Sequence, residues 1–165
     1  MIKHVFGRVF LVIIAWFTVS LYSIAEDLTN CYNSNKISSL DDKIILLTDC
    51  INYGMLSVDN ITYALINRGI IYGSKGQHDR AIADYNEAIR LKPDLGEAFN
   101  NRGIVYEGKG QHDRAIADYN EAIRLKPDYA DAFNNRGNAY VGRGQHDRAI
   151  ADYNEAIRLK QKQRP

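Results

Sequence analysis

The sequence is poor in cysteine, proline and tryptophan, and it has no excess of charge of either sign. It contains 2 Cys, 3 Pro and 1 Trp, and 21 Lys plus Arg against 20 Asp plus Glu give a formal net charge of +1. This balance excludes the basic surface of a dedicated nucleic-acid binder. With 45% hydrophobic and 25% charged residues, the chain is neither low-complexity nor intrinsically disordered by composition. We therefore expect a folded protein that does not bind nucleic acid.

The first 25 residues have the pattern of a secretory signal peptide. Lys3 and Arg8 form a basic start, residues 9–21 are an apolar run, and Ser23 and Ala25 place small residues before a cut. We expect cleavage after Ala25 and export to the periplasm or the cell exterior. The alternative is an uncleaved membrane anchor, but a spanning helix needs about 20 apolar residues and this run is shorter.

A repeat organises the rest of the chain. The string GQHDRAIADYNEAIRLK occurs three times unchanged, beginning at Gly76, Gly110 and Gly144, so the period is 34 residues. Self-similarity at this period is typical of stacked helical units. We set the repeats at 62–95, 96–129 and 130–163, preceded by a segment at 26–61.

The apolar spacing within each repeat predicts two helices. In repeat two, Phe99, Gly103 and Tyr106 share one helical face, and Tyr119 shares another with neighbouring small residues. Gly110 lies between them, where the chain needs the left-handed conformation that glycine adopts easily. The recurring tyrosines could stack on a ligand, but we interpret them as core residues. They are Tyr72, Tyr106 and Tyr140 in the first helices and Tyr85, Tyr119 and Tyr153 in the second.

The positions of these residues are also those of a known family. Repeat two, with Phe99, Arg102, Gly103, Tyr106, Gly110, Ala115, Tyr119, Ala122 and Pro127, resembles a tetratricopeptide repeat (TPR) of the exported bacterial type. The resemblance implies an all-α, right-handed solenoid of helix-turn-helix repeats, acting as a non-catalytic protein-interaction scaffold. One departure is Arg68, Arg102 and Arg136, where the family prefers leucine. Asp84, Asp118 and Asp152 are their candidate partners, within one repeat or between two.

The resemblance also implies where a partner binds. In such arrays the first helices line a concave groove that holds an extended peptide segment. The side chains expected there are Tyr63, Ile66, Asn67, Ile70, Glu97, Asn100, Asn101, Ile104, Glu107, Asp131, Asn134, Asn135, Asn138 and Val141. None is Lys or Arg, which members that clamp acidic tails require, so we expect a neutral or mildly basic peptide.

Asparagine recurs once per repeat in this groove, at Asn67, Asn101 and Asn135. The pattern is similar to the asparagine ladder of the O-GlcNAc transferase superhelix, where the amides hold a peptide backbone. An amide offers both a donor and an acceptor to main-chain groups. The alternative is that asparagine is simply the family's common residue at this position.

The last helix suggests a second surface. Solenoids commonly end in a cap with a polar outer face, yet the third repeat has the same string as the internal ones. Ile150, Tyr153 and Ile157 are therefore expected to form an apolar patch. This patch predicts self-association as a homodimer, or end-on docking to another helical protein.

No catalytic or metal site is expected. His78, His112 and His146 occupy the same turn position of successive repeats, about 10 Å apart, so they cannot converge on one ion. We interpret them as solvated turn residues. The sequence has no nucleophile elbow, phosphate loop or HExxH motif, so we expect neither an enzyme nor a cofactor nor a small-molecule substrate.

The segment at 26–61 holds both cysteines. Aligned on the second helix of a tetratricopeptide repeat, Asp41 to Asn52 place Cys50 on a small position at the helix contact, and the same register places Cys31 on the opposing small position. The segment thus resembles a degenerate capping repeat. The family geometry implies a Cys31–Cys50 disulfide, which export favours. The alternative is two buried free thiols.

Mass spectrometry of the unreduced, alkylated protein tests this disulfide. We expect a mass about two daltons below that of the dithiol and no alkylation of either cysteine, because one S–S bond removes two hydrogens and blocks both sulfurs. Alkylation of both thiols without prior reduction would contradict the pairing.

Overall fold

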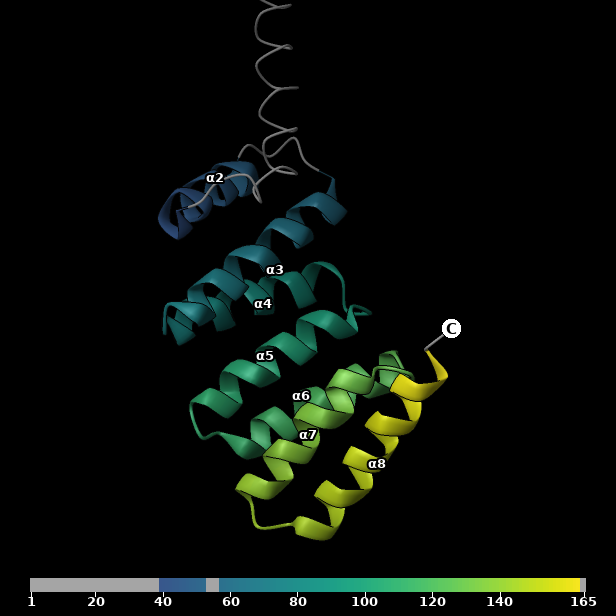
Figure 1. Ribbon diagram of the computed structural model, residues 1–165. Helices are drawn as coiled ribbons and strands as arrows, with labels where there is room; N and C mark the ends of the chain where they lie inside the picture. The colour runs from purple at the N-terminus through teal and green to yellow at the C-terminus, as the bar shows by residue number, and fades with distance from the viewer. Residues whose placement is uncertain (1–38, 53–56, 164–165) are drawn as a thin grey trace, which may run out of the picture. The chain divides into compact units, whose positions relative to one another are not determined.

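The computed structural model describes residues 39–52 and 57–163, and these residues form seven α-helices and no strand. Among them, no helix is long and apolar enough to cross a membrane. The expected signal peptide and Cys31 lie outside the described residues. The helices, labelled in Figure 1, are α2 (Leu40–Asn52), α3 (Val58–Ser74), α4 (His78–Leu91), α5 (Gly96–Gly108), α6 (His112–Leu125), α7 (Ala130–Gly142) and α8 (His146–Lys162).

The chain divides into two units, residues 1–54 and residues 55–165. In the first unit, α2 is amphipathic and buries Leu47 and Cys50. Cys50 is a position that the degenerate-repeat alignment places on the helix contact. The pairing of Cys50 with Cys31 stays a prediction.

The second unit contains three helix pairs. The first helix of each pair packs against the second, as α3 on α4, α5 on α6 and α7 on α8, and each second helix contacts the first helix of the next pair. Figure 1 shows α3, α5 and α7 following one another down the stack. The fold is therefore the all-α arrangement of helix-turn-helix repeats that the sequence predicts.

Glycine ends the first helix of every pair. Gly76, Gly110 and Gly144 have φ angles of 70°, 69° and 72°, the left-handed conformation predicted for them. In the middle turn, the backbone N–H of Gln111 then donates to the carbonyl of Tyr106 at 2.9 Å. This bond satisfies a carbonyl at the helix end and reverses the chain into the second helix.

A glycine and a tyrosine set the distance between the helices of a pair. The Tyr119 side chain is buried, at 1% exposure, and its ring lies over Gly103 on the facing helix. A Cβ atom added to Gly103 would lie 2.6 Å from Cε1 of Tyr119. Tyr85 and Tyr119 are thus core residues, as predicted, and burial raises the pKa of the Tyr119 phenol.

An arginine joins three helices in each of the last two repeats. In repeat two, Nε and Nη2 of Arg102 donate to the two carboxylate oxygens of Asp118 at 2.8 and 2.7 Å, and Nη1 donates to Asn86 on α4 at 2.6 Å. These bonds with Asp118 raise the pKa of Arg102 above its ordinary value. Arg136 repeats the pattern with Asp152 and Asn120.

The structure shows which aspartate each arginine binds, which the sequence left open. Each pair forms within one repeat, and Arg68 and Asp84 follow the same rule at 2.7 Å. The contact to the preceding repeat is made instead by an asparagine. A bidentate pair with little exposure to water is directional, so it orients the two helices as well as joining them.

Two glycine substitutions test the glycine–tyrosine contact. Gly103→Ala should lower the free energy of unfolding by about 1–3 kcal/mol, because the new methyl group overlaps the Tyr119 ring. Gly73→Ala is the matched control: its Cβ would meet Val105 at an ordinary 3.6 Å, so it should stabilise the helix by about 0.5–1 kcal/mol. Urea unfolding followed by circular dichroism measures both. Equal effects of the two variants would contradict the proposed role of the contact.

Candidate functional site

The first helices present a continuous face away from the second helices. Apolar side chains are exposed along it, with Tyr63 and Ile70 on α3, Ile104 on α5 and Val141 on α7. Among the expected groove residues, Glu97, Asp131, Asn134 and Asn138 are also exposed. We call this surface, made by the expected groove residues of α3, α5 and α7, the first-helix face.

The recurring asparagines lie on this face and are half-buried. Asn67 donates from Nδ2 to the Tyr63 carbonyl at 3.0 Å, and Asn135 donates from Nδ2 to Oδ1 of Asn100 at 3.0 Å. Asn101 accepts at Oδ1 from Nδ2 of Asn100 at 3.4 Å. In the part of the chain that the structure describes, no hydrogen bond engages Oδ1 of Asn67, Nδ2 of Asn101 or Oδ1 of Asn135. Each amide therefore keeps one polar atom for a ligand.

Two residues expected in the groove are buried instead. Ile66 is 6% exposed and Asn100 is 4% exposed. Asn100 is covered by the first helix of the next repeat, where it bonds to Asn135, and Ile66 holds the same position one repeat earlier. The prediction that these two side chains contact a peptide is therefore wrong. Asn134, their counterpart in repeat three, is exposed because no described helix follows α7 on that side.

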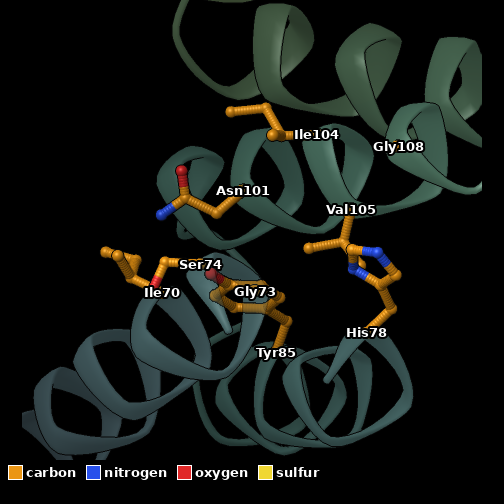
Figure 2. Close-up of a pocket in the computed structure, with 9 residues that line it drawn as sticks. All are labelled: Ile70, Gly73, Ser74, His78, Tyr85, Asn101, Ile104, Val105 and Gly108. Carbon is orange, nitrogen blue, oxygen red and sulfur yellow. The ribbon is translucent and has the colours of Figure 1, made fainter. Parts of the chain in front are cut away.

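A pocket opens on the first-helix face between repeats one and two. It has a volume of about 420 Å³ and lies where α3, α4 and α5 meet. Figure 2 shows its lining, which consists of Ile70, Gly73, Ser74, His78, Tyr85, Asn101, Ile104, Val105 and Gly108. In this view the His78 ring extends from α4 toward Val105 on α5. The walls are mostly apolar, and Ser74, His78 and Asn101 supply polar groups.

The three equivalent histidines have different surroundings, and only His146 is exposed as predicted. Nδ1 of His112 lies 3.0 Å from both carboxylate oxygens of Glu107. Nδ1 of His78 is buried and has no hydrogen-bond partner in the described chain. His78 and His112 are therefore half-buried, and the interpretation of them as solvated turn residues holds only in part. Within the described ranges, no group of His, Cys, Asp and Glu side chains is placed to hold a metal ion.

Comparing the repeats position by position could have revealed this difference. Gly73, Glu107 and Val141 occupy the same position of successive first helices. Glu107 supplies the carboxylate that His112 binds, whereas Gly73 has no side chain to offer His78. The first helices therefore give identical second helices different environments.

The outer face of α8 carries the other expected surface. Ile150 and Ile157 are each 56% exposed. Tyr153 is half-buried, because its ring packs over Gly137 and its hydroxyl donates to Asn138 at 2.8 Å. The exposed part of this surface consists of the two isoleucines, and Tyr153 belongs mainly to its own helix pair.

Comparisons with known proteins agree with this geometry. Models of the TPR repeat match residues 69–110 and 108–144, and a model of the tetratricopeptide repeat matches residues 130–163. The chain belongs to the tetratricopeptide repeat family. No curated protein sequence matches it significantly.

Solved structures show the same fold. A crystal structure of MamA is similar with a TM-score of 0.72 and 26% identity, over 82% of this chain and 77% of that one. The first TPR of Spaghetti (RPAP3), bound to the HSP90 peptide SRMEEVD, gives a TM-score of 0.59 and 26% identity, over 61% of this chain and 79% of that one. The second TPR of the same protein, bound to the same peptide, gives a TM-score of 0.58 and 26% identity, over 59% of this chain and 91% of that one. Tetratricopeptide repeats are protein-interaction scaffolds, and this chain has that architecture.

Proposed function

We propose that the protein is a non-catalytic scaffold that binds an extended peptide segment of a partner protein along its first-helix face. The observation that carries this proposal is the row of Asn67, Asn101 and Asn135, one per repeat, each with one amide atom left for a ligand. An extended peptide has a donor or an acceptor at every residue, so such a row suits its backbone whatever its sequence.

The charge of the first-helix face favours some peptides over others. The RPAP3 domains bind an acidic peptide, SRMEEVD. None of the residues of the first-helix face in this chain is Lys or Arg, and Glu97 and Asp131 are exposed on it. Carboxylates on the peptide would meet like charges there, which costs affinity. The peptide is therefore neutral or mildly basic, with its apolar end near Ile70 and Ile104.

We also propose that the protein works outside the cytoplasm. The sequence pattern of residues 1–25 supports export with cleavage after Ala25, to the periplasm or the cell exterior. The Cys31–Cys50 disulfide is part of the same proposal, since disulfides persist in oxidising compartments.

Selection of peptides from a random display library tests the binding proposal. We expect the full-length protein to enrich unstructured, non-acidic peptides, and Asn101→Ala with Asn135→Ala to weaken the selected ones by about tenfold. Two hydrogen bonds of about 0.5–1.5 kcal/mol each account for a loss of this size. Isothermal titration calorimetry measures the affinities.

Asn154→Ala is the matched control for this test, because Asn154 is exposed on α8, outside the first-helix face. It should leave the affinity unchanged. Asn135→Ala also removes a bond to buried Asn100, so the thermal unfolding of each variant is compared first. Unchanged affinity in the folded double variant would show that the asparagines do not hold the peptide.

A second candidate function is self-association through the outer face of α8. The observation in its favour is a contrast between repeats: Ile116 and Ile123 of α6 are half-buried, whereas their counterparts Ile150 and Ile157 are more than half exposed. Exposed apolar side chains that elsewhere in the stack cover the next repeat are suited to contact a second copy.

Sedimentation equilibrium at about 100 µM protein tests this surface, because a weak homodimer forms by mass action. We expect a concentration-dependent dimer that Ile150→Lys with Ile157→Lys converts to a monomer, since each lysine would place a charge in an apolar contact. Ala151→Lys, at an exposed position of the same helix, is the control and should still dimerise. A wild-type protein that remains monomeric at this concentration rules the dimer out.

A further inference from the structure

The pocket between repeats one and two differs from its counterpart by one side chain. His78 and His112 belong to identical second-helix strings, and both rings lie beneath the first helix of the next repeat, near Gly108 and Gly142 respectively. In repeat two, Glu107 reaches His112 and bonds to Nδ1. In repeat one, Gly73 has no side chain to take the equivalent position beside Nδ1 of His78. The chain thus contains this histidine site twice, once with a carboxylate bound and once without.

The site without a carboxylate leaves a polar atom unsatisfied. Nδ1 of His78 is shielded from solvent and lacks a partner among the described residues. Buried polar groups are nearly always hydrogen-bonded, and one left without a partner lowers the free energy of unfolding. A ligand atom that reached Nδ1 would recover this free energy on binding. The bond in repeat two indicates that an oxygen fits there, at about 3 Å.

The walls of the pocket define the rest of the ligand. Ile70, Ile104 and Val105 make them apolar, and the Tyr85 ring contributes an aromatic surface (Figure 2). The volume of about 420 Å³ falls in the range of about 300–1,000 Å³ that is usual for pockets that enclose small ligands. The ligand is therefore larger than a glutamate side chain, and most of its surface is apolar.

The charge of the surroundings selects the oxygen. A carboxylate would lose its hydration against the isoleucines, and among the described residues no Lys or Arg lines the pocket to compensate its charge. A neutral hydroxyl avoids this cost. It also donates or accepts, so it can bond to either tautomer of the His78 ring. A phenol combines this hydroxyl with an apolar, aromatic body.

We propose that the pocket lined by Ile70, Ile104, Val105 and His78 receives a tyrosine side chain of the bound peptide, whose hydroxyl hydrogen-bonds to Nδ1 of His78. The ring packs between Ile70 and Ile104 and takes the space that Gly73 leaves open. This inference rests on the proposed peptide-binding function and adds a side-chain preference to it. The asparagines bind the peptide backbone, and the pocket determines which residue lies between repeats one and two.

Side-chain analogues test the pocket without any peptide. The probes are 4-methylphenol for the tyrosine side chain, toluene for the phenylalanine side chain and butyrate for an aliphatic carboxylate, each titrated into the full-length protein. NMR signals of the His78 ring, assigned with a His78→Phe variant, report binding. We expect 4-methylphenol to shift these signals and to bind about tenfold more tightly than toluene, the gain from one hydrogen bond to a buried group. Butyrate should bind least.

Three variants make the test specific. Gly73→Glu installs the arrangement of repeat two and should abolish binding of 4-methylphenol. Asn154→Glu is the matched control, because it adds a glutamate at an exposed position of α8 outside this pocket and should leave binding at His78 unchanged. His78→Phe should make toluene and 4-methylphenol bind equally. Equal binding of the two in the wild type, tighter binding of butyrate, or unshifted His78 signals would overturn the proposal.

The peptide selection separates this inference from the function on which it rests. Selected peptides enriched in tyrosine that lose affinity in Gly73→Glu support both. Peptides that depend on the asparagines but lack tyrosine enrichment and tolerate Gly73→Glu overturn the pocket assignment alone. Binding of 4-methylphenol with no peptide selected leaves the pocket intact and removes the peptide-binding function, and with it the role proposed for the pocket.

Discussion

The contact between a glycine of the first helix and a tyrosine of the second holds each repeat in shape. Because Gly69, Gly103 and Gly137 have no Cβ, the rings of Tyr85, Tyr119 and Tyr153 can lie directly over the facing backbone. This approach brings the arginine of the first helix within bidentate reach of the aspartate of the second. The same distance recurs in every repeat, so the first helices come into line and form one face.

The two helices of a repeat have separate roles. The second helices share one sequence and supply the tyrosine over the facing glycine, the aspartate and the histidine of every repeat. The first helices keep the glycine and the arginine but change their outward residues. A single position, occupied by Gly73 in repeat one and Glu107 in repeat two, decides whether the neighbouring histidine is unsatisfied or bonded. Specificity can therefore change in the first helices without altering the packing between the helices.

The candidate site was only partly predictable from the sequence. The periodicity identifies which residues share a helical face, and it places Asn67, Asn101 and Asn135 correctly on the surface that α3, α5 and α7 form. It does not identify what the next repeat covers. Ile66 and Asn100 are buried by a neighbouring first helix, and the His78 ring is covered by the first helix of the next repeat. Such contacts join residues distant in sequence, and no local pattern records them.

By itself the sequence determined the class of fold, because helix formation, the left-handed glycine turns and the 34-residue period are local properties that recur along the chain. Tertiary structure alone decided which carboxylate each arginine binds, which groove residues are covered, and where a pocket opens. The physical reason is that these properties depend on the distance and orientation between helices. That geometry is set by the packing of several side chains together, and a change as small as glycine for glutamate is enough to open a cavity.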